Sequence, residues 1–173
     1  AMRRRLPAHR GGGGSVNVGR ILVGFTVITA AIAGAALWYT AERAFYLPVS
    51  FTPGQEIRLV SVATGQPEPI LVEGIDGVDA DSSPIKFRAC FTTPMSLATL
   101  TETYQVYPAA EPLIAPSNFP CFDAEAIGEA LEKGEAVAFL SEPEIHKGVD
   151  RVVAVFPDGH AFAWQQLNDA YKD

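Results

Sequence analysis

The sequence predicts an α+β protein with one N-terminal transmembrane helix, followed by a small, mainly antiparallel β-sheet domain with two helices. Three observations predict this fold class. Residues 21–41 carry no charge, two alternating apolar runs flank a glycine-ended turn at 157–159, and two further segments show helix caps before apolar stripes. The 173 residues leave room for one modest domain beside the helix. A hydrophobic content of 48% excludes a wholly disordered chain.

The charge of the chain is divided between two segments of opposite sign. Residues 1–20 hold five arginines and no acid, whereas residues 21–173 hold 8 basic and 20 acidic residues, a net charge of −12. The total of −7 hides this division. A mostly acidic domain with dispersed cations does not indicate nucleic-acid binding, so no nucleic-acid partner is expected.

Residues 21–41 are predicted to cross a membrane as a helix. At 1.5 Å per residue, a helix of this length spans about 31 Å, which matches the ~30 Å core of a bilayer. Trp38 and Tyr39 lie at its C-terminal end, where amphipathic aromatic rings favour the membrane interface. Because the arginines precede the span, the positive-inside rule predicts that residues 1–20 form a basic, flexible cytoplasmic tail.

The N-terminal part keeps three alternatives open. Its basic stretch, apolar run and small residues also resemble a secretory signal peptide that would be cleaved near residues 36–41. The tail contains GGGGS, a flexible linker sequence, so residues 1–17 are either natural or an addition; a natural basic tail would contact lipid head groups. Small residues spaced four apart predict packing against another transmembrane helix, although such residues are common in membrane helices generally. These helix-packing residues are Ala30, Ala31, Gly34 and Ala35.

The residues after the span are expected on the opposite side of the membrane, in a bacterial periplasm. Residues 42–49 are predicted to be a linker, and residues 50–173 a periplasmic α+β domain anchored in the inner membrane. Apolar alternation predicts its strands. They are Glu56–Ala63, Ile70–Val78, Ile85–Phe91, Glu135–Leu140 and a hairpin of Val152–Phe156 with His160–Trp164.

Two helices are predicted between the strands. Thr93 is a suitable N-cap with Pro94 in the first helical position, and a second helix would begin after Asp123 and end at Gly134. Between them, residues 107–120 hold four prolines and are expected to form an irregular loop.

Cys90 and Cys121 are predicted to form a structural disulfide. Disulfides persist in the periplasm, and a crosslink across this stretch would stabilise the fold by about 3–4 kcal/mol in the chain-entropy model. Two alternatives stay open, namely two unpaired buried thiols and a functional pair of thiols. The sequence lacks the C-x-x-C pattern of a redox centre and the C-x-x-C-H pattern of covalent haem.

No catalytic, cofactor-binding or metal-binding residue is predicted, and no small-molecule substrate is identified. The histidines show no metal-ligand spacing, and they are His9, His146 and His160. We expect His146 in a polar loop and His160 at the surface. Three aspartates depart from the calcium-loop pattern and are expected in a solvated turn; these are Asp76, Asp79 and Asp81.

Four strings of the sequence resemble a family of small single-span proteins of alphaproteobacteria, a domain of unknown function. They are GRILVGF, PEPILVEGIDGVDADSSPIKFRACFTTPMSLATLTETY, CFDAEAIGEALEKGEAVAFL and GVDRVVAVFPDGHAFAWQQ. The resemblance covers the chain from about Val18 onward and implies an inner-membrane location. It implies no activity and no catalytic residue.

These observations predict a non-enzymatic, single-span accessory or assembly subunit of an inner-membrane complex, whose partners are membrane lipid and the transmembrane helices of that complex. By analogy, respiratory and photosynthetic electron-transport complexes are candidate hosts. The alternative is a periplasmic binding or sensing module, with residues 76–84 and 107–120 as contact surfaces. An enzyme would require His146, Asp150 and Arg151 to converge in a cleft.

Overall fold

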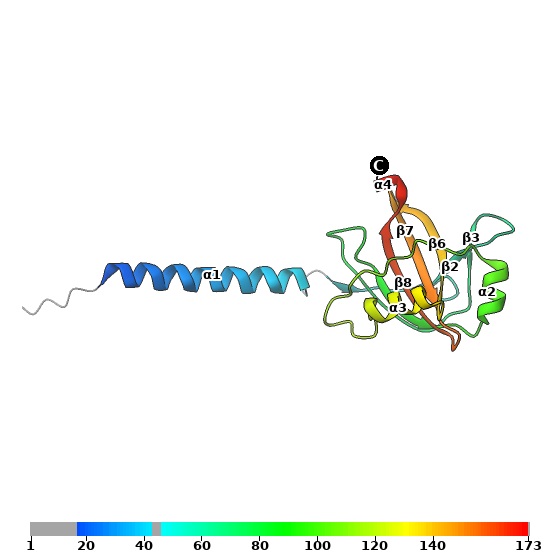
Figure 1. The fold of residues 1–173 in the computed structure, drawn as a ribbon, viewed down its shortest axis with the longest axis horizontal. Coiled ribbons are helices and arrows are strands. Elements are labelled where there is room, and N and C mark those ends of the chain that lie inside the picture. Colours follow the sequence, from blue (N-terminus) through cyan, green and yellow to red (C-terminus); the bar gives the residue numbers. More distant parts are fainter. Residues whose placement is uncertain (1–16, 43–45, 173) are drawn as a thin grey trace, which may run out of the picture. The chain divides into compact units, whose positions relative to one another are not determined.

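The computed structural model describes residues 17–42 and 46–172. Residues 1–16 of the expected tail, His9 among them, lie outside this part, as do residues 43–45 of the expected linker. The described chain forms one apolar helix, a six-stranded antiparallel sheet, a two-stranded sheet and three further helices (Figure 1). This is the predicted α+β class.

Helix α1, Val18–Glu42, contains the predicted span and begins three residues before it. An 18-residue stretch within residues 18–41 has a mean hydropathy of 2.1, so the helix is long and apolar enough to cross a membrane. Two of its threonine hydroxyls bond within the helix: Thr26 donates to the carbonyl of Leu22 at 2.9 Å, and Thr29 donates to that of Phe25. These polar groups therefore add no unsatisfied donor to the apolar surface.

The main sheet has the strand order β1-β4-β5-β8-β7-β6. Its strands are β1 (Leu47–Pro48), β4 (Glu73–Asp79), β5 (Arg88–Thr92), β6 (Val137–His146), β7 (Val149–Val155) and β8 (His160–Leu167), and the small sheet pairs β2 (Arg58–Val60) with β3 (Pro67–Pro69). Strand β1 lies within the segment expected to be a linker and pairs with the end of β4. The sheet therefore begins earlier than the composition suggests.

Both faces of the main sheet are covered. One core holds Phe87, directly before β5, and Ala89 and Phe91 of β5, together with β2 and helix α2, Leu97–Thr103. The other core holds Trp164 of β8 together with Ile127 of helix α3, Ala124–Lys133, which lies across the sheet (Figure 1). Since successive strand residues point to opposite faces, β7 and β8 are apolar at consecutive positions rather than strictly alternating.

The helices begin and end at residues with suitable caps. Asp123 accepts hydrogen bonds from the backbone of Glu125 and Ala126, and Gly134 ends α3 in the left-handed conformation at φ 71°, as predicted. The N-cap of α2 is Ser96 rather than the predicted Thr93, because the Ser96 hydroxyl accepts from the amide of Thr99 at 3.2 Å; Pro94 lies before the helix. A short helix, α4 (Asp169–Lys172), follows β8.

Strand β6 extends six residues beyond its predicted end. The pairing of β6 with β7 shifts register on both sides of Glu142, and Glu144 adopts a positive φ of 49°. Because of these irregularities, residues 141–146 do not alternate between apolar and polar side chains. The sequence therefore predicts a polar loop, although this segment pairs with β7. His146 lies at the end of this strand, opposite Val149.

Residues 105–107 cover the edge of β6 that does not face β7. The proline-rich loop, residues 107–120, begins there. The amide of Tyr107 donates to the carbonyl of Ala138 at 2.8 Å, and the amide of Leu140 donates to that of Gln105 at 2.9 Å. Covering an edge strand in this way prevents unwanted pairing with other chains. It also brings the proline-rich loop alongside α3.

Candidate binding groove

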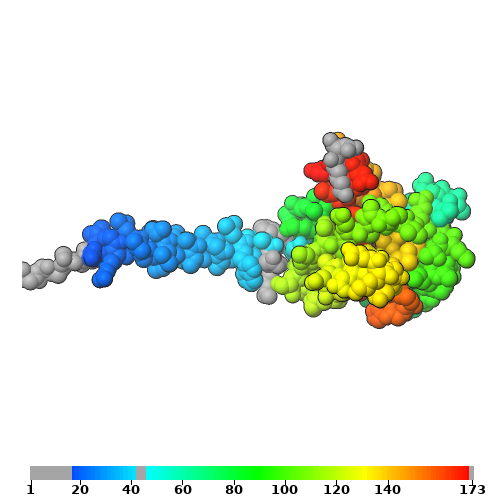
Figure 2. Space-filling model, in the orientation of Figure 1, coloured from blue at the N-terminus to red at the C-terminus, as the bar shows by residue number. Residues whose placement is uncertain are grey.

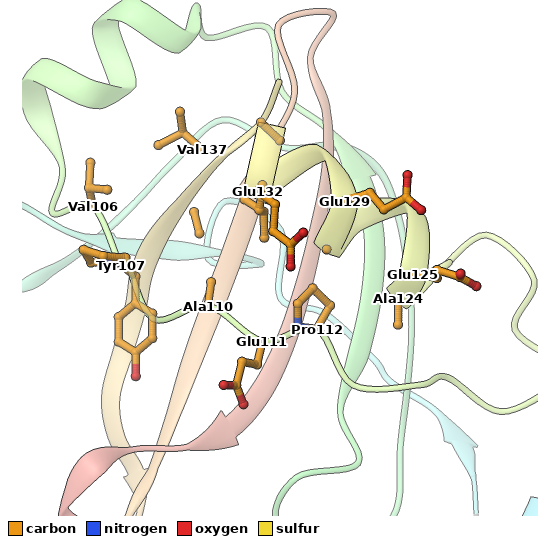
Figure 3. Close-up of a pocket in the computed structure, with 15 residues that line it drawn as sticks. Val106, Tyr107, Ala110, Glu111, Pro112, Ala124, Glu125, Glu129, Glu132 and Val137 are labelled. Atoms are coloured by element: carbon orange, nitrogen blue, oxygen red, sulfur yellow. The ribbon is translucent and has the colours of Figure 1, made fainter. Parts of the chain in front are cut away.

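A groove of about 710 Å³ lies between α3 and residues 106–112. Figure 2 shows α3 in yellow beside the green proline-rich loop on one exposed face, and Figure 3 shows residues that line the groove. Its apolar lining comes from the loop, from α3 and from the start of β6. The apolar lining residues are Val106, Tyr107, Pro108, Ala110, Pro112, Ala124, Leu131, Ala136, Val137 and Ala138.

The remaining lining residues make the groove acidic. Glu125, Glu129 and Glu132 follow one another along α3, and Glu111 lies across from them on the loop (Figure 3). Among the residues that the structure describes, no lysine or arginine lines the groove. Glu129 forms an exposed ion pair with Lys133 at 2.9 Å, whereas in the described part of the chain the other three carboxylates have no cationic partner. The groove thus combines an apolar floor with a negative rim.

Arg88 of β5 fixes the middle of the proline-rich loop. Its guanidinium donates to the carbonyls of Leu113 at 2.7 Å and Ile114 at 3.2 Å, and to those of Ile85 and Phe87 beside it. Arg88 is only 3% exposed, and burial lowers the pKa of its guanidinium to about 10. The charge therefore persists at neutral pH, and backbone carbonyls satisfy its donors.

Gln166 of β8 fixes the loop close to the groove. Its side-chain nitrogen donates to the carbonyl of Ala109 at 2.9 Å, and its Oε1 accepts from the amide of Glu111 at 2.8 Å. The same oxygen accepts from Trp164 Nε1 at 3.0 Å. Gln166 is buried, so water does not compete for these bonds. They therefore fix the position of the backbone at Glu111.

Tyr107 and Asp150 fix the start of the loop. The tyrosine hydroxyl donates to Asp150 Oδ2 at 3.1 Å, and Asp150 Oδ1 accepts from the amide of Glu144 and from Asn168 Nδ2. Burial, and then the negative charge of Asp150, raises the pKa of Tyr107 to about 12. The phenol is therefore a neutral donor at physiological pH.

A disulfide joins Cys90 of β5 to Cys121, with a Cα–Cα distance of 6.4 Å. Cys121 directly follows the proline-rich loop and lies two residues before the N-cap of α3. The loop is thus attached to the sheet at its start, its middle and its end. This attachment gives the groove a wall that exists before any ligand binds.

The three polar residues considered for an enzyme do not share one cleft. Asp150 faces Tyr107, whereas Arg151 lies over the ring of Phe87 at 4.1 Å on the opposite face of the sheet. His146 lies at a hollow that Asp79 and Gln165 also line, and Asp150 is not among its lining residues.

The other polar residues named from the sequence lie elsewhere. The expectation of a solvated turn is wrong for Asp76 and Asp79, which belong to β4, and only Asp81 lies in the turn after it. His160 contacts Asp158 at the hairpin turn, with 2.8 Å between Nδ1 and Oδ2. Across residues 17–42 and 46–172, no group of three or more His, Cys, Asp or Glu side chains is placed to hold a metal ion.

The residues predicted for membrane contact all belong to α1. Ala30, Ala31, Gly34 and Ala35 have exposed side-chain positions, and no atom lies within 4 Å of where a Cβ on Gly34 would be. Trp38 and Tyr39 are also exposed, at 58% and 55%. The helix surface is therefore available to lipid or to another helix.

Sequence reasoning missed Arg88, Tyr107 and Gln166, the residues that position the loop. One signal was available for Arg88, because an arginine inside the apolar string IKFRACF requires buried partners. Nothing comparable marked Gln166, whose partner Ala109 is 57 residues away.

Comparison with known proteins places the chain in a family. A model of a family of unknown function, DUF6446, matches residues 57–173, which include the groove and exclude α1. Neither the curated proteins nor the solved structures contain a match to this chain.

Proposed function

Because this chain belongs to DUF6446, a family of unknown function, we propose a function from its own geometry: a non-enzymatic binding module anchored in a membrane. The observation that carries this proposal is the preformed groove beneath the proline-rich loop. A groove with an apolar floor, a polar rim and a fixed wall is typical of a binding site. The separation of Asp150 from Arg151 on opposite faces of the sheet also favours binding over catalysis.

The location that we propose is a bacterial inner membrane, with the tail in the cytoplasm and the domain in the periplasm. Two observations support it: the five arginines before α1, and the disulfide, which fits an oxidising compartment. Protease treatment of intact spheroplasts tests the orientation. We expect loss of the domain from whole spheroplasts, and a domain that is cleaved only after lysis contradicts the proposal.

A photoreactive amino acid placed at Gly128 tests whether the groove is occupied. Gly128 lines the groove, and no atom lies within 4 Å of its added Cβ, so the substitution leaves the fold intact. The matched control is Glu102, an exposed residue of α2 on the other face of the sheet. In native membranes we expect an adduct from position 128 that position 102 does not form. No adduct, or the same adduct from both positions, overturns the proposal.

The second candidate function is the accessory or assembly subunit of an inner-membrane complex. It is favoured by the exposed surface of α1, where the small residues Ala30 and Gly34 leave space for a partner helix. Copurification after mild detergent extraction tests it, and a protein that migrates alone while membrane complexes stay intact contradicts it. An electron-transport complex as the host stays a prediction.

A further inference from the structure

We propose that the groove binds a basic, partly apolar segment of a partner protein. This inference rests on the binding function proposed above and specifies its ligand. It follows from the charge on the two walls, from the apolar floor between them and from the length of the groove along α3.

Electrostatic complementarity selects a cationic ligand. Residues 123–135 hold five acidic residues and one lysine, and Glu111 adds a carboxylate from the opposite wall. Of the four glutamates that line the groove, only Glu129 has an ion-pair partner among the described residues. Lysine or arginine side chains of a ligand would meet carboxylates on both sides, which attracts basic segments and repels acidic ones.

The same charge argues against a second copy of this domain as the occupant. Residues 21–173 carry a net charge of −12, so two such domains would bring like charges together at the acidic rim. The basic residues 1–20 of this chain lie on the other side of the membrane in the orientation proposed above, so the occupant is a different protein with a basic segment.

The apolar floor and the length of the groove favour a peptide over a small cation. Leu131 and Val137 are partly exposed lining residues and offer apolar surface, where aliphatic side chains and the stems of lysines can lie. The lining along α3 runs from Ala124 to Glu132, about 12 Å of helix. A small polyamine would satisfy the rim and leave this floor exposed.

The class of ligand is tested by measuring the binding of synthetic peptides to the full-length protein in nanodiscs. The nanodiscs are made of zwitterionic lipid, because this lipid itself attracts little basic peptide. The probe is a labelled peptide of alternating Lys and Leu, compared with alternating Glu and Leu, alternating Lys and Ser, and spermidine. We expect the Lys–Leu peptide to bind most tightly. Its affinity should fall as the salt concentration rises, because salt screens the charges of the rim. Equal binding of all four, or tighter binding of the Glu–Leu peptide, overturns the proposal.

Variants locate the binding in the groove. The double variant Glu125→Gln with Glu132→Gln should lower the affinity for the Lys–Leu peptide roughly threefold to tenfold. This is the range expected from the loss of two exposed charge pairs. Glu102→Gln with Glu73→Gln removes the same charge away from the groove and should leave the affinity unchanged. The reversal Glu125→Lys with Glu132→Lys should shift the preference toward the Glu–Leu peptide. If both neutralised pairs weaken binding equally, nonspecific charge attraction explains the result and the proposal fails.

The crosslink at Gly128 separates failure of this inference from failure of the proposed function. Sequencing the partner peptide attached at position 128 reads the ligand directly. A basic segment with apolar residues supports both proposals. An acidic or uncharged segment overturns the inference while the groove remains a binding site, and the absence of an adduct overturns both.

Discussion

The hydroxyl of Tyr107 donates a hydrogen bond to Asp150 Oδ2 over 3.1 Å, across 43 residues of sequence. Asp150 in turn accepts from the amide of Glu144 and from Asn168, so one carboxylate joins the proline-rich loop, β6 and the end of β8. Three distant segments therefore depend on a single side chain of β7.

Replacing Tyr107 with Phe should lower the free energy of unfolding by about 1 kcal/mol, the usual contribution of one hydrogen bond. Urea unfolding of the full-length protein in neutral detergent measures the change. Tyr171→Phe is the control, because Tyr171 is 63% exposed. If the two variants unfold at the same urea concentration, the Tyr107–Asp150 bond contributes nothing to stability.

The same tyrosine predicts a pH dependence in the alkaline range. The fold raises the pKa of Tyr107 to about 12, so it favours the neutral phenol. This contribution is fully present below the usual tyrosine pKa of about 10 and is lost as the pH rises through about 12. The wild type should therefore lose more stability than Tyr107→Phe between these two pH values. Parallel stability curves for the two proteins would refute this account.

Arg88→Met should destabilise the domain by at least about 3 kcal/mol. The substitution keeps much of the side-chain volume but leaves the carbonyls of Leu113 and Ile114 without a donor. Arg88→Lys should rescue only part of the loss, since an ammonium cannot reach four carbonyls as a planar guanidinium does. Faster hydrogen exchange in residues 109–116 should accompany the loss.

Lys133→Met is the matched control for Arg88→Met. It removes an exposed ion pair with Glu129 and should cost no more than about 1 kcal/mol. A comparable loss from both variants would mean that the buried bonds of Arg88 matter no more than a surface contact.

Removing the disulfide with Cys90→Ser and Cys121→Ser should cost about 3–4 kcal/mol by the chain-entropy model. Reduction of the wild type should lower its urea midpoint to nearly the same value. The control is reduction of the double variant, which should change nothing. An unchanged midpoint in the double variant would show that the crosslink does not constrain the unfolded chain as this model requires.

Two glycines should respond in opposite directions to alanine. Gly159 has a φ of 91°, and a Cβ there would lie 2.7 Å from the carbonyl oxygen of Thr93, so Gly159→Ala should cost about 1–3 kcal/mol. Gly128 lies inside α3 with open space around it, so Gly128→Ala should stabilise the protein by up to about 1 kcal/mol. Thermal unfolding of both variants makes the comparison, and a loss in both would contradict it.

The elements predicted well from the sequence depend on short-range contacts. Asp123 bonds to amides two and three residues later, and Gly134 ends the same helix, so α3 could be located from a short window of residues. Helix α1 required only a count of uncharged residues. The sequence predicts an end of β6 at Leu140, six residues too early, because the bulged pairing around Glu142 follows no simple period.

The groove could not be predicted because its parts meet only through long-range contacts. The carbonyl of Leu113 lies 25 residues from Arg88, and Ala109 lies 57 residues from Gln166. A loop with four prolines has no period that would indicate which face of the sheet it covers. The acidic residues of α3 were visible in the sequence, but the opposite wall that makes them part of a groove was not.

The strand order has a consequence for how the chain is made. Strand β5 lies between β4 and β8, and Ala89 pairs with Ala163, so the sheet cannot close until the last strand has been synthesised. Cys121 emerges from the ribosome well before that strand. A bond between Cys90 and Cys121 requires no residue of β7 or β8, so it can hold β5 beside the start of α3 before the last strand is present.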